Sequence, residues 1–194
     1  MVNYLPPIIL ASQSPRRKQL LEWAEIDFTV EVIPTEETFP PGLMVEEVPV
    51  FIAREKARQV NEACNPRQLT LLAADTIVVL DNQIIGKPRD AAEAESILSR
   101  LSGKTHRVIT GVVILHPQGE TSFSEVTEVT FHQLSTDQIK HYVNRYQPFD
   151  KAGSYAIQEW IGVIGIQSIK GDFYNVMGLP VSRVVQALHK IFPH

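Results

Sequence analysis

Residues 69–80 form a run of apolar, mostly branched side chains that a single carboxylate, Asp75, interrupts. Such a run predicts a buried β-strand, because branched side chains pack well on a pleated surface. A buried carboxylate without a partner is costly, so we expect Asp75 to meet a cation, a metal ion or a cluster of hydrogen-bond donors. The alternative is that the strand frays at Asp75 and the side chain reaches water.

The rest of the chain mixes strand and helix patterns without strict alternation. Further strands are expected at 7–11, 28–33, 83–85, 107–115, 120–131, 155–158 and 160–169. Helices are expected from Pro15 onward and at 46–64, 90–101, 135–145 and 180–191, with Ser135 and Gln138 as a capping box. This order predicts an α/β fold in which helices pack on a mixed sheet. No internal repeat or linker divides the chain, so we treat residues 1–194 as one domain.

Composition excludes several classes of protein. The 194 residues carry 18 basic and 22 acidic side chains, and the net charge of −4 argues against a nucleic-acid coat. No stretch of about 18 apolar residues is present, so we expect no membrane span. The first residues do not show the order of a signal peptide. The one cysteine, Cys64, cannot form an internal disulfide, which favours a reduced, cytoplasmic protein.

The segment LASQSPRR, which begins at residue 10, is the most informative part of the sequence. A strand ends there, Ser12 and Ser14 present hydroxyls, and a helix begins with free N–H groups at its positive end. Arg16 and Arg17 lie in the first turn, where cations oppose the helix dipole by roughly 0.3–1 kcal/mol each. A bound polyphosphate would account for them, since guanidinium groups bind phosphate oxygens well. Alternatively, Ser14 caps the helix and the arginines are solvated or pair with surface carboxylates.

Two later positions could also contact such a ligand. Lys87 lies in a loop next to a proline and could be a second phosphate ligand, although the loop could equally be an ordinary turn. The carboxamide of Gln158 offers a donor and an acceptor, which suits the edge of a nucleobase, but a glutamine at a strand end could simply face water. The sequence Gly103-Lys104-Thr105 is not a P-loop, because Leu98 stands where that motif has its first glycine.

Together, these segments resemble the Maf family of nucleoside triphosphate pyrophosphatases along nearly the whole chain. The matching pieces are LASQSPRR (10–17), Glu37, AREKA (53–57), AADT (73–76), GKP (86–88) with Asp90, Ser102 and Gly103 with His106, Thr110 with Gly111, DKAG (150–153) with Gln158, Gly171 with Asp172, Asn175 with Val176, and GLP (178–180). The resemblance implies hydrolysis between the α and β phosphates with a divalent cation. It also implies an elongated Maf/ITPase-like fold with two lobes around a cleft.

The resemblance assigns roles to individual residues. Asp75 is similar to the family's catalytic proton acceptor, although a carboxylate near Mg²⁺ could equally orient the water or hold the metal. Glu37 is the candidate second metal ligand, for Mg²⁺ or Mn²⁺, with its neighbour Glu36 as an alternative. The predicted phosphate ligands are Ser12, Ser14, Arg16, Arg17, Lys56 and Lys87.

Three positions, Arg16, Thr76 and Gln158, are similar to the branch of the family that acts on dTTP and UTP. They imply a pyrimidine triphosphate as the small-molecule substrate. Two other functions stay open at this point: a non-catalytic nucleotide-binding regulator of cell division and septum formation, and a nucleotidyltransferase with a second substrate. The oligomeric state is open as well, with a homodimer as one option.

Overall fold

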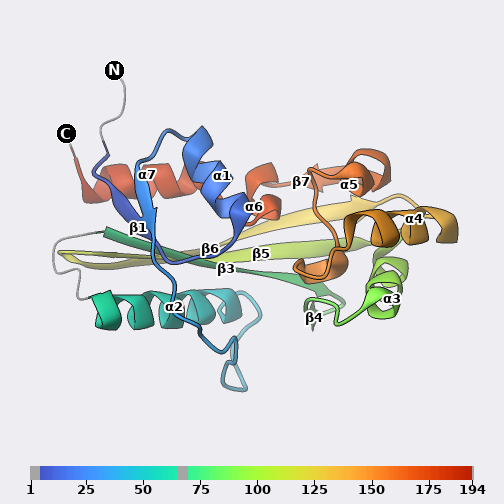
Figure 1. Cartoon of the computed structure of the whole chain (residues 1–194), viewed down its shortest axis with the longest axis horizontal. Helices are drawn as coiled ribbons and strands as arrows, with labels where there is room; N and C mark the ends of the chain where they lie inside the picture. The colour runs from blue at the N-terminus through green and yellow to red at the C-terminus, as the bar shows by residue number, and fades with distance from the viewer. Residues whose placement is uncertain (1–4, 65–69, 194) are drawn as a thin grey trace. The chain divides into compact units, whose positions relative to one another are not determined.

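The computed structural model describes residues 5–64 and 70–193, so Leu69, the expected start of one strand, lies outside the described residues. The expected mixture of strands and helices is confirmed (Figure 1). In chain order the elements are β1 (Ile8–Leu10), α1 (Pro15–Trp23), β2 (Phe28–Val30), α2 (Val48–Cys64), β3 (Thr70–Leu80), β4 (Gln83–Ile85), α3 (Ala91–Leu101), β5 (Thr105–His116), β6 (Gly119–Phe131), α4 (Thr136–Tyr146), η1 (Ala152–Ser154), α5 (Trp160–Gly165), β7 (Ile166–Lys170), α6 (Phe173–Met177) and α7 (Val181–Ile191).

The strands form a mixed sheet, as predicted. Within the described residues, seven strands pair in the order β2-β1-β3-β5-β6-β7, with β4 added to β3. Strand β1 runs parallel to both β2 and β3, whereas β4 and β7 run antiparallel to β3 and β6. The register places Ile9 beside Leu71, so residues of the same parity on β1 and β3 share one face of the sheet.

The chain groups into two compact units. The first comprises the described parts of Met1–Asp75, Thr110–Glu125 and Gly178–His194, and the second comprises Thr76–Ile109 and Val126–Met177. Strands β3, β5 and β6 therefore contribute residues to both units. The elongated outline and the cleft that the resemblance implies stay predictions.

Helix α2 packs on one face of the strands of the first unit, and α1 and α7 lie on the opposite face (Figure 1). The buried residues on the α2 side are Ile9, Ala11, Ala53, Ala57, Val60, Leu71, Ala73 and Val113. Successive strand residues point to opposite faces, so Asp75 shares the face of Leu71 and Ala73. The strand period therefore directs Asp75 toward the helix that carries Lys56.

A glycine sets how closely α2 approaches the sheet. A Cβ added at Gly111 of β5 would lie 2.2 Å from the Pro49 carbonyl carbon and 2.2 Å from the Val50 nitrogen. These are backbone atoms of the first turn of α2, so a larger residue could not be accommodated by a change of rotamer alone. Gly111 thereby fixes the helix at the distance from which its side chains reach the sheet.

The strand predicted at 155–158 is wrong, and the strand predicted at 160–169 is confirmed only from Ile166 onward. Residues 155–158 lead into a turn, residues 160–165 form α5, and only 166–170 form a strand. A short apolar run cannot distinguish a helix from a strand by its periodicity. Here the Gly162 and Val163 N–H groups both donate to the Glu159 carbonyl and start a helix instead.

Other boundaries differ less from prediction. The strand expected at 28–33 ends at Val30, the helix expected at 46–64 begins at Val48, and the short elements η1 and α6 were not predicted. The capping box of α4 is confirmed, because Ser135 Oγ accepts from the Gln138 N–H and Gln138 Oε1 accepts from the Ser135 N–H.

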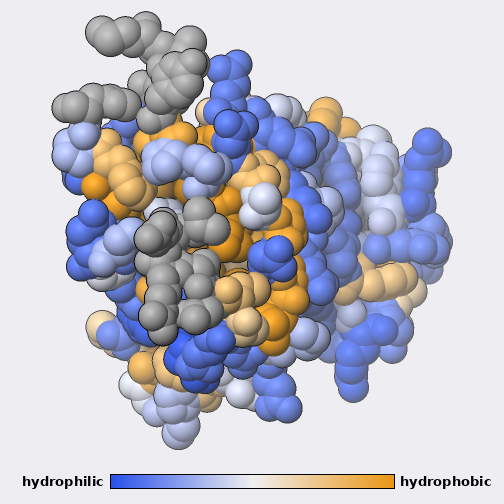
Figure 2. All heavy atoms as spheres, turned by 60° about the vertical axis from the view of Figure 1, so that its left-hand side comes forward, coloured by the Kyte–Doolittle hydropathy of each residue, from blue (hydrophilic) through white to orange (hydrophobic). Residues whose placement is uncertain are grey.

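No helix in the described part of the chain is both long enough and apolar enough to cross a membrane. Figure 2 shows one face of the molecule, on which apolar side chains gather in a patch bordered by hydrophilic ones. A hollow of about 760 Å³ lies against α7 and the β5–β6 hairpin, where apolar residues such as Phe123 and Ile191 meet the charged residues Arg183 and Lys190.

The core of the second unit contains a buried histidine. His106 is 1% exposed, and its Nε2 lies 2.7 Å from the Tyr155 hydroxyl oxygen. Its ring stacks on Phe131 at a centroid distance of 5.5 Å. Burial among these rings disfavours the charged imidazolium and lowers the pKa of His106 to about 4.

This burial predicts a loss of stability in mild acid. His106 titrates near 6.5 when unfolded and at about 4 when folded, so between these values only the unfolded chain binds the proton. The free energy of unfolding should therefore fall as the pH drops from 6.5 to 4, by on the order of 3 kcal/mol from this group. Urea unfolding at pH 7, 5.5 and 4.5 measures the fall. His106→Gln should reduce the slope, whereas the exposed His141→Gln should keep it; equal slopes in the two variants would contradict the assignment.

Candidate functional site

The turn between β1 and α1 is organised by Ser12 rather than by Ser14. Ser14 occupies the N-cap position of α1, as the sequence suggested, but its side chain makes no capping hydrogen bond. Instead the Ser14 N–H donates to Ser12 Oγ at 3.3 Å. Ser12 is 6% exposed, and its hydroxyl oxygen also accepts a hydrogen bond from a buried arginine.

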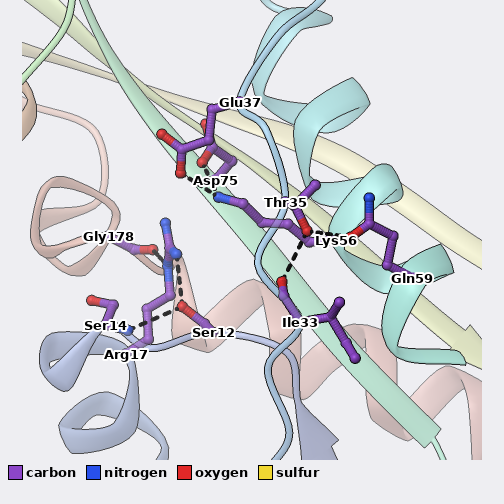
Figure 3. A network of polar contacts seen from close by, with 10 residues as sticks. All are labelled: Ser12, Ser14, Arg17, Ile33, Thr35, Glu37, Lys56, Gln59, Asp75 and Gly178. Carbon is purple, nitrogen blue, oxygen red and sulfur yellow. Dashed lines mark hydrogen bonds and ion pairs between the residues drawn. The ribbon is translucent and has the colours of Figure 1, made fainter. Parts of the chain in front are cut away.

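That arginine is Arg17, which ties the turn to a distant part of the chain (Figure 3). Its Nη1 donates to Ser12 Oγ at 2.9 Å, and its Nε donates to the Gly178 carbonyl at 2.7 Å. Burial lowers the pKa of the Arg17 guanidinium; the negative charge of Asp75 opposes this shift most strongly, and Glu37 opposes it more weakly. Arg17 is thus a positive charge held in place within the field of two carboxylates.

Asp75 meets a cation, as predicted, and that cation is Lys56. The Lys56 Nζ donates to Asp75 Oδ1 at 2.6 Å and to Glu37 Oε1 at 2.8 Å (Figure 3). The Asp75 side chain is 10% exposed, that of Lys56 is 17% exposed and that of Glu37 is 46% exposed. Strand β3 continues past Asp75 to Leu80, so the alternative of a frayed strand is wrong.

The segment that carries Glu37 is also attached to α2. Thr35 Oγ1 lies 2.9 Å from Gln59 Oε1 and 3.0 Å from the Ile33 carbonyl, so its hydroxyl can donate to either (Figure 3). This contact lies two residues before Glu37 and one helical turn beyond Lys56. Of the two adjacent glutamates considered from the sequence, Glu37 is therefore the one that reaches the ammonium group.

Glu37 and Asp75 fit a divalent cation of the Mg²⁺ or Mn²⁺ type. Such ions are commonly bound through one or two carboxylates, with waters and substrate phosphates as the remaining ligands. Glu37 and Asp75 present carboxylate oxygens to a single positive charge, which shows that their side chains converge. Across residues 5–64 and 70–193, no group of three or more His, Cys, Asp or Glu side chains could hold a metal ion. These residues therefore contain no complete protein cage for a metal ion.

The structure places the remaining predicted residues on the surface or near it. Arg16 is half-buried in the first turn of α1. Thr76, Lys87 and Gln158 belong to the second unit, where Thr76 is half-buried in β3 and the other two are exposed. Their roles as ligands stay predictions. The sequence did not predict that the Gly178 carbonyl accepts from Arg17 or that Thr35 contacts Gln59. No motif marks a backbone acceptor or a hydrogen bond between two surface side chains.

A comparison with known families identifies the family of the chain. The family model described as Maf-like protein matches residues 7–191. The chain belongs to the Maf-like protein family. The match spans both units and every residue discussed above.

Curated relatives of this Maf-like chain match it over most of their length. A protein named dTTP/UTP pyrophosphatase from Phocaeicola vulgatus is 51% identical over 185 residues, covering 95% of each chain. A protein of the same name from Cytophaga hutchinsonii is 50% identical over 193 residues, covering 98% of this chain and 88% of its own. Among solved structures, the Staphylococcus aureus Ham1 protein aligns with 64% of this chain and 71% of its own at a TM-score of 0.45 and 17% identity, which is too distant to support a conclusion.

The contacts of Arg17 predict a structural cost when it is replaced in this Maf-like chain. Arg17→Met removes two hydrogen bonds from a charged donor, one to the Gly178 carbonyl and one to Ser12 Oγ. We expect the free energy of unfolding to fall by about 1.5–3 kcal/mol in urea. Lys18→Met in the same helix is the control, since the Lys18 side chain forms no hydrogen bond or ion pair with the residues that the structure describes. Equal losses in the two variants would show that the contacts of Arg17 contribute nothing.

Proposed function

We propose that this Maf-like chain is a nucleoside triphosphate pyrophosphatase that hydrolyses dTTP and UTP to the monophosphate and pyrophosphate. The observation that carries the proposal is that the carboxylates of Asp75 and Glu37 converge on the ammonium group of Lys56. Asp75 itself lies in a buried strand. The name dTTP/UTP pyrophosphatase, shared by curated relatives that are 50–51% identical, supports the substrate. The intact set of basic residues around Asp75 favours an enzyme over a sensor that only binds nucleotides.

Asp75 acts as the general base in this proposal. Lys56 donates to Oδ1, which leaves Oδ2 as the oxygen that can accept a proton from water. The water oxygen forms a bond to the α phosphorus as its proton passes to Asp75. The bond between the α phosphorus and the bridging oxygen then breaks, and pyrophosphate leaves with the electron pair.

Basic residues stabilise the charge that develops on the leaving group. Lys56, Arg16 and Lys87 contact phosphate oxygens, while Ser12, Ser14 and the first N–H groups of α1 supply further donors. Arg17 contributes mainly its positive charge, because its Nε and Nη1 already donate within the chain. Glu37 and Asp75 would hold a divalent cation, Mg²⁺ or Mn²⁺, which supplies positive charge to the triphosphate when it is bound.

The pyrimidine is read by hydrogen bonds. Thymine and uracil present a carbonyl, an N–H and a second carbonyl along one edge, and the carboxamide of Gln158 can both donate to and accept from this edge. Arg16 and Thr76 support the same substrate, because both positions are similar to the branch of the family that acts on dTTP and UTP. A site built on such hydrogen bonds discriminates strongly against bases with a different pattern, because its polar groups are then left unpaired.

The proposal also covers the type of ligand, the location of the protein in the cell and its assembly. The ligand is a free nucleoside triphosphate rather than a nucleic acid, in keeping with a net charge of −4. A cytoplasmic location agrees with a single exposed cysteine, Cys64. Assembly as a homodimer is compatible with the same activity.

The reaction predicts which product appears. With Mg²⁺ or Mn²⁺, dTTP and UTP should each give pyrophosphate and the monophosphate, and chelation of the metal should abolish the release. A coupled assay that detects pyrophosphate and inorganic phosphate separately checks this across a panel of nucleotides. Release of inorganic phosphate alone would overturn the reaction, and a product that depends on an added acceptor would indicate a nucleotidyltransferase.

The role of Asp75 predicts a large loss of turnover on Asp75→Asn. We expect kcat to fall by about a hundredfold or more, because the amide cannot accept the proton, while nucleotide binding measured by calorimetry is largely retained. Asp81→Asn, at an exposed residue next to β4, is the control and should keep wild-type turnover. Near-normal activity of Asp75→Asn would assign the base to another residue.

A further inference from the structure

Gln158 lies at the tip of a tight turn. The Glu159 N–H donates to the Ala156 carbonyl at 3.1 Å, which closes a four-residue turn with Ile157 and Gln158 in its middle. The Gln158 side chain is exposed and forms no hydrogen bond with the residues that the structure describes. The turn therefore presents its carboxamide to a ligand, and the position of the carboxamide depends on how the turn is held.

One buried hydroxyl holds both ends of this turn. Tyr142 of α4 is 0% exposed, and its hydroxyl oxygen accepts from the Ala156 N–H at 3.2 Å. The same hydroxyl donates to Glu159 Oε2 in a short hydrogen bond. Since Ala156 and Glu159 are the first and last residues of the turn, Tyr142 fixes the ends between which Gln158 is presented.

Charge strengthens this connection. Lys151 is 8% exposed, and its Nζ lies 3.5 Å from Glu159 Oε1 and 2.8 Å from Asp150 Oδ1. The Glu159 side chain is 24% exposed, and a hydrogen bond to a carboxylate is stronger than one between neutral groups. Burial raises the pKa of the Tyr142 hydroxyl, so it remains a proton donor to Glu159 throughout the physiological range.

Helix α5 supports the turn from its other side. The Gly162 N–H donates to the Glu159 carbonyl at 2.9 Å. A Cβ at Gly162 would lie 1.8 Å from the Ile157 carbonyl oxygen, so only glycine lets the turn rest directly on the helix. The turn is thus held by a side-chain hydroxyl at its ends and by a helix backbone behind it.

We propose that Tyr142 and Glu159 are positioning residues that set the pyrimidine specificity of the enzyme by fixing the turn that carries Gln158. The inference rests on the proposed function, in which Gln158 reads the base. Thymine and cytosine present opposite hydrogen-bonding groups at two neighbouring ring positions. A carboxamide held in one place can favour thymine, whereas one that moves with a loosened turn can adapt to either base.

The test compares Tyr142→Phe with Tyr146→Phe. Both remove one hydroxyl from α4, and the two rings stack on each other at a centroid distance of 5.0 Å, but only Tyr142 bonds the turn. Steady-state kinetics with dTTP, UTP and dCTP in Mg²⁺ should show that Tyr142→Phe raises KM for dTTP and UTP by about tenfold, with kcat changed less than about twofold. The preference for dTTP over dCTP should fall by about tenfold, whereas Tyr146→Phe should match the wild type.

A second measurement needs no nucleotide. Hydrogen exchange of the Ala156 amide should be faster in Tyr142→Phe than in the wild type and in Tyr146→Phe, because its acceptor is gone. Glu159→Gln, which keeps an acceptor for Tyr142 but loses the charge facing Lys151, should give a smaller effect in both measurements and serves if Tyr142→Phe does not fold.

The outcomes separate the inference from the function on which it rests. Faster exchange of Ala156 with an unchanged preference for dTTP overturns the inference, and so does an unchanged exchange rate. If the wild type releases no pyrophosphate from dTTP or UTP, the proposed function itself is overturned, and this is known before any variant is compared.

Discussion

The first unit is arranged around the ion pair between Asp75 and Lys56. A carboxylate inside an apolar strand would be strongly destabilising without a partner, and the ammonium group that compensates it comes from the helix packed on the same face. That packing requires the helix to lie close to the sheet, which Gly111 allows. Glu37 then joins the same ammonium group at 2.8 Å, at the more exposed side of the pair. The ion pair therefore depends on the packing of α2 on the sheet, and through Lys56 it brings the buried Asp75 close to the more exposed Glu37.

Buried charged groups and buried neutral groups differ in whether they have hydrogen-bond partners. In the first unit, the buried charges of Arg17 and Asp75 each have a partner from a distant element: the Gly178 carbonyl and the half-buried Lys56. In the second unit, three buried side-chain atoms, His106 Nδ1, Ser154 Oγ and Asn175 Oδ1, have no hydrogen-bond partner among the described residues. Neutral groups are less costly to leave in this way than charges. His106 illustrates the point, since it remains neutral when folded.

Sequence reasoning predicted the features that depend on local pattern. The strand around Asp75, the need of this carboxylate for a compensating partner and the capping box of α4 all follow from a few neighbouring residues. The identity of the cation did not follow from pattern alone, because the spacing between residues 56 and 75 has no fixed geometry until the helix has packed. The partner of Arg17 lies 161 residues away, and a carbonyl acceptor leaves no signature in the sequence. The segment from 155 to 169 was misread because its hydrogen bonds, rather than its apolar content, decide between helix and strand.

The bond from Arg17 to the Gly178 carbonyl also has a consequence for biosynthesis. The first unit is assembled from three separate stretches of the chain, and the last of them begins at Gly178. During translation Arg17 leaves the ribosome before Gly178, whose carbonyl accepts from it and which lies 161 residues further along the chain. Until Gly178 has been synthesised, the hydrogen bond from the Arg17 guanidinium to its carbonyl cannot form, and the first unit lacks helix α7. The first unit can therefore be completed only after the segment that begins at Gly178 has been synthesised.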